Sequence, residues 1–369
     1  MLSPFLSHFS GILNDSNILN FLSKNLKISI IINSFMPKIK ESKITWKDRE
    51  ILFHLSLNAR ASLKQVSKKT NLSKEVIHYR LKNLEKRGII EGYYAVINTY
   101  KMGRVFYRVY VKTINMTTKI EKQFLEYLKN HPKVTWIVDV NGDLDFLYVV
   151  WSNNISDFEE VYNEINDKFG KYFQEKFFSV MTNVYYFKYK YLVEKEDSTY
   201  KLTGGKIVHP KLDELDLKLL TLLSNDGRLP LTKIAETLNS NTKIIHRRMK
   251  KLKKEGIITC YNVKINHKLL GYTQRKVMLN LNDTSRESVK NLISFIINHK
   301  NTIYITIAIG QYDLEFEMME KSHEDFHLLL KELKNRFPGL IKEYFTVIFY
   351  DEPKVGQLSF IEFPEAVNK

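Results

Sequence analysis

The stretch IHYRLKNLEKRGIIEGYYAVIN (residues 77–98) returns later in the chain as IHRRMKKLKKEGIITCYNVKIN (residues 245–266). Corresponding positions lie 168 residues apart, and this offset holds without a gap from Asp48 and Asp216 into the second half of each copy. A register kept over so long a stretch indicates an internal repeat, and a repeat decides the architecture before any single motif does. The chain is therefore interpreted as a tandem duplication.

The duplication divides the chain into segments of different character. The two units cover residues 43–192 and 213–352, and the polar stretch between them, with Gly204, Gly205 and Pro210, is interpreted as a linker. The expected order is an N-terminal extension at 1–42, a helix-turn-helix at 43–101, a small α/β domain at 102–192, the linker at 193–212, a second helix-turn-helix at 213–268, a second α/β domain at 269–352, and a C-terminal tail at 353–369.

Composition limits the classes of protein that need to be considered. The chain has 369 residues, 44% of them hydrophobic, so several cores can be buried. Its formal net charge of +16 points to a polyanionic partner. The single cysteine, Cys260, excludes an intrachain disulfide and a cysteine-based metal cluster, and it fits a reducing cytoplasm.

The first 42 residues differ from the rest in character. Apolar residues recur, but Lys24 and Lys27 interrupt them, and no run approaches the roughly 20 apolar residues that span a bilayer. The start also lacks the basic region and the cleavage site of a signal peptide. We interpret this segment as an amphipathic extension without membrane contact. A translated leader preceding Met36 is the alternative, and no function is assigned to the segment.

The front of each unit has the apolar spacing of three short helices. In the first unit apolar residues recur at intervals of three and four around Leu52, Val66 and Leu81, and the second unit repeats this around Leu220 and Ile234. Three short helices with a tight turn between the last two describe a helix-turn-helix.

Capping residues bound the third helix of each unit. Ser73 and Asn241 stand where a helix begins, and Gly88 and Gly256 stand where it ends. The apolar and aromatic residues that follow, up to Tyr94 in the first unit, suggest a short strand or wing.

The distribution of charge identifies the polyanion. Residues 43–101 contain 13 basic and 5 acidic side chains, and residues 213–268 contain 12 and 6. Nearly all of the excess positive charge therefore lies on the two helix-turn-helix segments, as neutralisation of phosphates requires. The expected partner is double-stranded DNA.

The third helix of each unit supplies the candidate DNA contacts, since its apolar residues face the core. Residues near the start of such a helix meet base edges in the major groove, and the later basic residues meet phosphates. The candidates are Lys74, His78, Tyr79, Lys82, Lys86 and Arg87 in the first unit and Lys243, His246, Arg247, Lys250 and Lys251 in the second. No second ligand lies at a useful spacing from His78 or His246, so no metal site is expected.

The back of each unit predicts a βαββαβ order, which is ferredoxin-like. The Asn141-Gly142 pair is a strong hairpin signal. In the first unit we expect strands at 105–113, 134–140, 145–151 and 177–187, with helices at 119–130 and 158–169. In the second we expect strands at 277–281, 303–309, 314–318 and 344–349, with helices at 289–297 and 326–333.

A sheet covered by helices on one face leaves its other face open, and here that face is rich in apolar and aromatic residues. We therefore expect the sheets to pair face to face, either within one chain as a pseudo-dimer or between chains as a homo-oligomer. The two helix-turn-helix segments would then lie side by side, which suits DNA half-sites about one helical turn apart.

These motifs together resemble the Lrp/AsnC (feast/famine) transcription regulators. The resemblance covers both units, and the fold it implies is α+β, a tandem repeat of a winged helix-turn-helix and a ferredoxin-like sensor (RAM) domain. The stretches that resemble the family's opening helix run from Asp48 through Leu52 and Leu55 to Asn58-Ala59-Arg60, and from Asp216 through Leu220 and Leu223 to Asp226-Gly227-Arg228.

The resemblance also implies an effector. Gly142-Asp143-Leu144-Asp145 and Gly310-Gln311-Tyr312-Asp313 are similar to the Gly-x-x-Asp turn of the amino-acid-responsive domain. An amino acid or related molecule would bind near Gly142 and Asp145 or near Gly310 and Asp313, with the aspartate facing its ammonium group. The alternative is that these are ordinary hairpin turns, in which glycine supplies a positive φ. Divergence such as Tyr79 against Arg247 argues against identical half-sites.

Two other functions remain open at this stage. One branch of the fold decarboxylates siroheme, and it would show a His and Arg cluster at the start of the sensor domain and tetrapyrrole absorbance. Here residues 103–108 and 271–276 contain arginines but no histidine. The other is a ligand-binding protein that has lost DNA binding. No catalytic motif or cofactor loop stands out, so the prediction is a non-enzymatic cytoplasmic regulator without catalytic residues, metal or cofactor.

Overall fold

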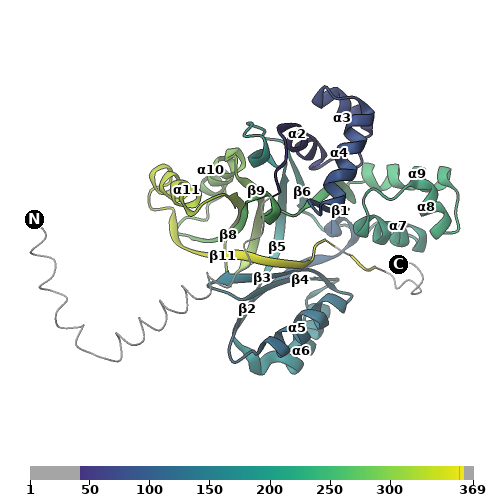
Figure 1. The fold of residues 1–369 in the computed structure, drawn as a ribbon. Helices are drawn as coiled ribbons and strands as arrows, with labels where there is room; N and C mark the ends of the chain where they lie inside the picture. Colours follow the sequence, from purple (N-terminus) through teal and green to yellow (C-terminus); the bar gives the residue numbers. More distant parts are fainter. Residues whose placement is uncertain (1–41, 357, 361–369) are drawn as a thin grey trace, which may run out of the picture. The chain divides into compact units, whose positions relative to one another are not determined.

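A computed structural model describes residues 42–356 and 358–360 (Figure 1). The interpretations of the N-terminal extension as amphipathic or as a leader lie outside the described residues, apart from Ser42, as does most of the predicted tail. Within the described part, no helix combines the length and apolar character that crossing a bilayer requires.

Each unit begins with the three predicted helices. In the first unit they are α2 (Trp46–Leu55), α3 (Leu63–Thr70) and α4 (Lys74–Lys86). In the second they are α7 (Glu214–Asn225), α8 (Leu231–Thr237) and α9 (Thr242–Lys254). Short 3-10 turns elsewhere in the chain are η1 (Thr99–Met102), η2 (Gly170–Tyr172), η3 (Lys190–Leu192) and η4 (Lys268–Leu270).

The βαββαβ prediction is confirmed in both units, and every strand except β2 and β4 runs longer than the apolar pattern indicated. The first unit has β2 (Val105–Thr113), α5 (Thr118–Asn130), β3 (Val134–Gly142), β4 (Phe146–Ser152), α6 (Ile155–Phe169) and β5 (Phe173–Phe187). The second has β8 (Thr273–Leu281), α10 (Arg286–Asn298), β9 (Thr302–Gly310), β10 (Leu314–Glu320), α11 (His323–Arg336) and β11 (Ile341–Lys354).

The two four-stranded sheets join at both edges. The strand order is β2-β4-β3-β11-β8-β10-β9-β5, and β5 pairs back onto β2, so eight strands close into a ring. Two antiparallel seams connect the units, β3 with β11 and β5 with β9. The sheets thus pair within one chain, and hydrogen-bonded edges join them in addition to the expected contact of their faces.

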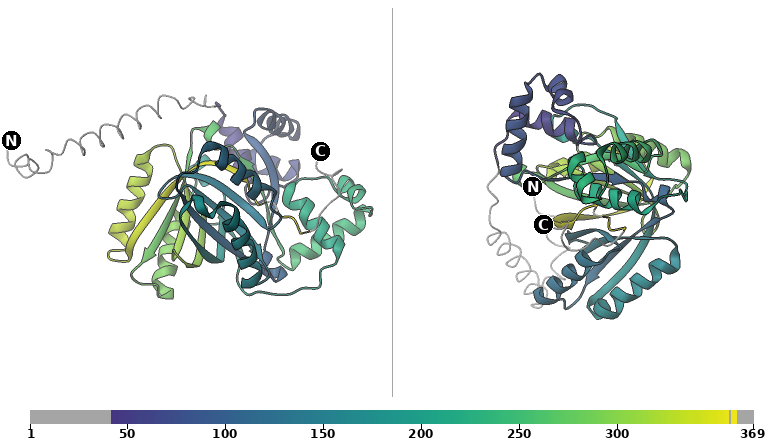
Figure 2. Two further views of the ribbon diagram at one scale, coloured as in Figure 1. Left: turned by 90° about the horizontal axis from the view of Figure 1, so that it is seen from below. Right: turned by 90° about the vertical axis from the view of Figure 1, so that its right-hand side faces the viewer.

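The pleat of each strand divides its side chains between two cores. On β2, Tyr107 and Val109 pack against the helices of their own unit, whereas Tyr110 faces the interior of the ring. The interior also buries charge, since Lys276 and Glu315 are both fully buried. The helices α5 and α6 cover one side of the ring and α10 and α11 another (Figures 1 and 2).

Two buried lysines connect the units reciprocally at helix ends. Lys354, at the end of the last strand of unit two, donates to the carbonyls of Lys129 (2.9 Å) and His131 (3.1 Å), where α5 ends. Lys190, just after the last strand of unit one, donates to the carbonyl of Ile297 near the end of α10. A cation at a helix C-terminus satisfies carbonyls that lack a partner within the helix.

The linker prediction is wrong in one respect. Within residues 193–212 the chain forms β6 (Tyr200–Gly204), which pairs with β5, because β5 extends beyond its contact with β2 and offers a free edge. The predicted tail likewise begins too early, since β11 continues to Lys354. β6 has no apolar run of its own and forms because the edge of a neighbouring strand is available for pairing. Such a strand gives no signal in the sequence.

The prediction of a short strand or wing after each helix-turn-helix is confirmed as a strand. The strand after each helix-turn-helix, β1 (Ile90–Ile97) or β7 (Ile258–Ile265), pairs with its counterpart in the other unit. Together they form a separate two-stranded ribbon between the units. These strands therefore join the halves of the molecule.

Gly142 tests how closely the seam is packed. Its φ of +140° is unfavourable for other residues, and a Cβ there would meet the Thr346 carbonyl at 2.5 Å. We expect Gly142→Ala to lower the free energy of unfolding by about 1–3 kcal/mol in urea titrations. The control is Gly92→Ala on β1, where no atom lies within 4 Å of the added Cβ. Equal losses in both variants would contradict the seam.

Candidate DNA-binding interface

The third helix of each head begins at a capping side chain and ends at a glycine, as predicted. We call residues 46–86 head 1 and residues 214–254 head 2. Ser73 Oγ accepts from Val76 N at 3.3 Å, and Asn241 Oδ1 accepts from Ile244 N at 2.9 Å. Gly88, just past the end of α4, has a φ of +68°, which favours glycine. The caps fix where α4 and α9 begin and therefore which residues point outward.

A repeated ion pair holds each third helix on the first helix of its head. Arg80 Nη1 lies 2.9 Å from Asp48 Oδ1, and Arg248 Nη1 lies 2.8 Å from Asp216 Oδ1. Burial favours the neutral acid, but hydrogen bonds from Thr45 and Arg80 outweigh it and lower the pKa of Asp48. These two arginines therefore orient the helices, and they are less available to DNA.

The predicted DNA-contacting residues lie outward in both heads. Tyr79 is 71% exposed. Arg87 is half-buried, and its Nη2 donates to the Lys43 carbonyl at 2.7 Å, so part of its guanidinium is engaged. The other predicted residues are all exposed: Lys74, His78, Lys82 and Lys86 on α4, and Lys243, His246, Arg247, Lys250 and Lys251 on α9.

The two third helices differ strongly in charge. Helix α4 has four basic and two acidic residues, whereas α9 has seven basic residues and no acidic one. Lys82 is also paired with Glu85 at 2.9 Å, which itself accepts from Tyr93. No carboxylate on α9 competes for its lysines, so its positive potential is the stronger.

The ribbon and a few direct bonds hold the heads together. Ala59 N donates to the Tyr261 carbonyl on β7, and Gly227 N donates to the Tyr93 carbonyl on β1, both at 2.8 Å. Arg60 Nη1 crosses between the heads to the carbonyls of Gly227 (2.8 Å) and Leu229 (2.9 Å). The expectation that the heads lie side by side is confirmed, because each bonds to the other's strand.

The two Gly-x-x-Asp turns lie at the seams between units. Asp145 accepts from Thr113 N at 2.7 Å and pairs with Lys112 at 2.9 Å. Asp313 makes the corresponding bond to Leu281 N at 2.8 Å. Both aspartates thus fasten a hairpin to the neighbouring strand.

The turn glycines pack against backbone of the other unit. Gly142 lies against Thr346 of β11, and Gly310 lies against Phe178 and Ser179 of β5. Both glycines adopt a positive φ, as expected of a hairpin turn of this kind.

Comparison with known families finds a helix-turn-helix in each half of the chain. Residues 47–91 match the family described as winged helix-turn-helix DNA-binding. Residues 212–253 match the AsnC-type helix-turn-helix domain.

Relatives match one unit at a time. The HTH-type transcriptional regulator LrpA of Pyrococcus horikoshii is 34% identical over 127 residues, which cover 34% of this chain and 85% of that protein. The chain belongs to the Lrp/AsnC family of DNA-binding transcription regulators. A second P. horikoshii relative of this Lrp/AsnC protein, the regulator FL11, is 27% identical over 40% of the chain and 95% of the relative.

Among solved structures, the siroheme decarboxylase NirDL spans nearly the whole Lrp/AsnC chain. It covers 86% of this chain and 94% of its own, with a TM-score of 0.58 and 12% identity. At this identity the likeness shows a shared fold and nothing more.

The arginines that open the sensor domains are engaged within the protein. Arg104 packs over the rings of Trp151 and Phe360, at 4.3 and 4.7 Å from their centroids. Arg275 forms two hydrogen bonds to Glu320, at 2.8 and 2.9 Å. No cluster of three or more potential metal ligands occurs in the part of the chain that the structure covers.

The charged residues inside the ring are not among those that the sequence pattern predicts as site residues. Glu315 and Glu317 alternate with Leu314 and Phe316, a pattern typical of a strand with one solvent-exposed face. The structure buries both faces, and Glu315 bonds to Arg108 and Lys276. One sequence signal was available: Arg108 and Lys276 occupy the same position in the two copies, and an exposed sheet face does not require a basic residue at that position in both.

The ion pair between Arg248 of α9 and Asp216 of α7 can be tested directly. Arg248→Met leaves Asp216, whose side chain is 2% exposed, without its ion-pair partner. We expect the free energy of unfolding to fall by about 1–3 kcal/mol, measured by urea denaturation. The control is Lys233→Met, which removes the exposed pair with Glu236 and should cost under about 0.5 kcal/mol. If the free energy of unfolding falls no more than in the control, Arg248 does not hold α9 on α7.

Proposed function

We propose that one chain binds one double-stranded operator as a pseudo-dimer, with α4 and α9 in major grooves about one helical turn apart. The observation that carries this proposal is the outward position of basic and polar residues in two heads joined by a single ribbon, with His78 and Lys82 of one head corresponding to His246 and Lys250 of the other. Two heads fixed to each other favour two half-sites at a fixed spacing.

The half-sites are unlike each other. Arg247 can donate two hydrogen bonds to guanine in the major groove, whereas Tyr79 at the corresponding position of α4 cannot. Helix α9, with seven basic residues, supplies most of the phosphate contacts, and Arg247 adds the capacity to recognise guanine. The operator is accordingly an imperfect palindrome at most.

Charge reversal on the two helices tests this division. Lys250→Glu should weaken binding to a selected operator by about 10–100-fold, because it removes a phosphate contact and adds repulsion. Lys82→Glu should weaken it by only about threefold to tenfold, since Glu85 already neutralises part of that charge. Fluorescence anisotropy at several salt concentrations measures both affinities and the salt slope, which should fall by about 1–2 for Lys250→Glu.

Lys331→Glu provides the matched control, since Lys331 is an exposed lysine on the sensor helix α11. It changes net charge by the same amount and should leave affinity within about twofold. If the double variant at Lys82 and Lys250 binds as tightly as Lys331→Glu, DNA is not held by these helices.

An amino acid or related effector acting at the Gly-x-x-Asp turns is part of the proposal. The local bonds of the Asp145 carboxylate leave it little capacity, whereas the Asp313 carboxylate makes a single hydrogen bond within the described residues, from Leu281 N. The turn at Gly310 and Asp313 is therefore the stronger of the two candidate sites, since a carboxylate oxygen there can accept from an ammonium group.

Operator selection with and without pooled amino acids tests the effector. An active amino acid should shift affinity by about 5–150-fold, and Asp313→Asn should remove that shift while retaining the acceptor for Leu281 N. Asp143→Asn, in the other turn, is the control. If Asp313→Asn responds to effector as the wild type does, the ligand does not bind at this turn.

A non-enzymatic role in the cytoplasm fits this proposal. The likeness to a siroheme decarboxylase concerns the fold, whereas the relatives matched by sequence are regulators. The engagement of Arg104 and Arg275 inside the protein also leaves fewer cations for tetrapyrrole carboxylates. Siroheme bound with the absorbance of a stoichiometric complex would favour the enzyme instead.

A further inference from the structure

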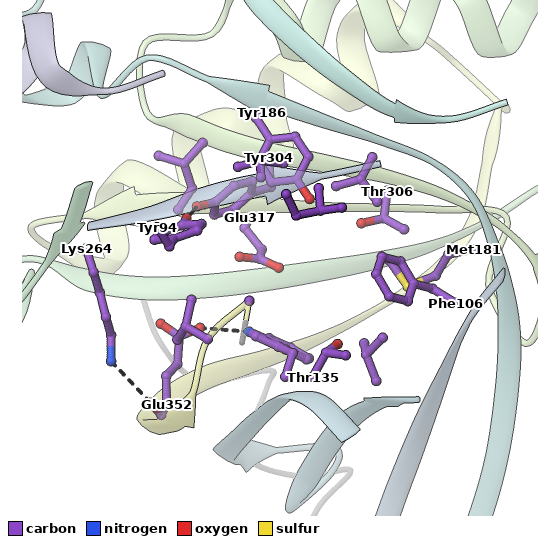
Figure 3. Close-up of a pocket in the computed structure, with 18 of the residues that line it drawn as sticks. Tyr94, Phe106, Thr135, Met181, Tyr186, Lys264, Tyr304, Thr306, Glu317 and Glu352 are labelled. Carbon is purple, nitrogen blue, oxygen red and sulfur yellow. Dashed lines mark hydrogen bonds between the residues drawn. The ribbon is translucent and has the colours of Figure 1, made fainter. Parts of the chain in front are cut away.

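A cavity of about 140 Å³ lies inside the ring, between the sensor sheets and the β1–β7 ribbon (Figure 3). Its walls come from both units, including Val149 of β4, Tyr304 of β9 and Tyr94 of β1. A cavity of roughly 150 Å³ admits a molecule about the size of benzene. None of the Gly-x-x-Asp residues lines this cavity, so it is distinct from the effector site considered above.

The cavity has a polar lining of buried, charged groups. Arg108 is 4% exposed, and its Nη1 bonds to Glu315, but its Nε has no partner among the described residues. Glu317 is held by Gln274 at 2.8 Å and by Lys276 at 2.7 Å. A dry cavity would be lined by apolar groups, because an unpaired buried donor costs free energy.

Glu352 enters the same space from β11. Its Oε1 accepts from Trp136 Nε1 at 3.0 Å. Figure 3 shows the carboxylates of Glu317 and Glu352 directed into the cavity from different strands. Two carboxylates that face one buried volume repel each other unless a positive charge lies between them.

Acidic and basic groups both line this volume. Burial and the nearby Glu317 raise the pKa of Glu352 to about 7, although Lys264 opposes the shift. His267 also lines the cavity, but burial lowers its pKa to about 3, so it stays neutral. The charged side chains that line the cavity are Arg108 and Lys264 against Glu317 and Glu352.

We propose that this cavity binds a small primary ammonium compound, with its charged group between Glu317 and Glu352 and an oxygen of its body accepting from Arg108 Nε. Trp136 and Tyr304 add aromatic surface that favours a cation. Phe106, Val149 and Met181 surround the rest of the volume and suit a short apolar chain. The ligand contacts both copies of the sensor domain at once.

The position of the cavity connects it to the DNA-binding heads. Residues 94–97 of β1 form part of its wall, and β1 belongs to the ribbon that bonds to both heads. Leu358 also lines it, and Leu358 N bonds to Ser224 Oγ of α7 at 3.2 Å. An effect of the ligand on operator affinity rests on the proposed function, whereas binding of the ligand does not.

Calorimetric titration of the full chain at about pH 8.5 tests the site, since Glu352 is then ionised while an alkylamine keeps its proton. Pentylammonium should bind, and pentan-1-ol, which has the same length without the charge, should bind at least about tenfold more weakly. 3-Methoxypropylammonium replaces one methylene by oxygen and should bind about tenfold more tightly than pentylammonium, because Arg108 Nε gains an acceptor. These comparisons need no protein variant.

Glu352→Gln keeps the acceptor for Trp136 and removes the charge. It should weaken pentylammonium binding by about tenfold or more, whereas Glu343→Gln, an exposed site on the same strand, should have no effect. Wild-type affinity should rise with pH through about 7 as Glu352 loses its proton, and Glu352→Gln should abolish this rise. Equal binding of the alcohol and the ammonium, an unchanged affinity in Glu352→Gln, or no detectable binding of either amine would overturn the proposal.

Discussion

Pairing of the two sensor sheets at both edges is the constraint on which the rest of the molecule depends. Each sheet alone would leave two strands with unpaired backbone groups and one charged inner face in water. The seams β3–β11 and β5–β9 remove those edges and place the inner faces against each other. The orientation of the heads, the ribbon between them and the buried charges all follow from this closure.

The inner faces have diverged so that each copy needs the other. Glu315 and Glu317 of the second copy correspond to Leu147 and Val149 of the first, whereas Arg108 corresponds to the basic Lys276. A symmetric pair of first copies would bury two arginines without these carboxylates, and a symmetric pair of second copies would bury four glutamates around two lysines. Both pairings are costly. The mixed pair satisfies the charges, so the buried network specifies the partner as well as stabilising it.

Much of the architecture could be predicted from the sequence, because the signals were local. Apolar spacing and capping residues such as Ser73 and Asn241 fixed the heads, and the repeat offset fixed the two βαββαβ domains.

Contacts between strands distant in sequence could not be predicted. The strand β6 has no pattern of its own, the ribbon strands resemble a wing, and Glu315 alternates as if it faced solvent. For the ribbon strands and Glu315 the deciding neighbour lies in the other copy, and for β6 it is the free edge of β5. For the interface, exposure of Lys250 or Arg247 followed from helical periodicity, but the engagement of Arg87 with Lys43 did not.

The covalent link between the copies changes how such a regulator responds to its own abundance. Two separate subunits must first find each other, so at low copy number their joint occupancy of a site falls as the square of subunit concentration. Here residues 193–212, which contain β6, connect the second unit covalently to the first, so the two units never separate. With one chain to each operator, as proposed, occupancy scales with the first power of concentration, and each molecule remains as competent at low abundance as at high abundance.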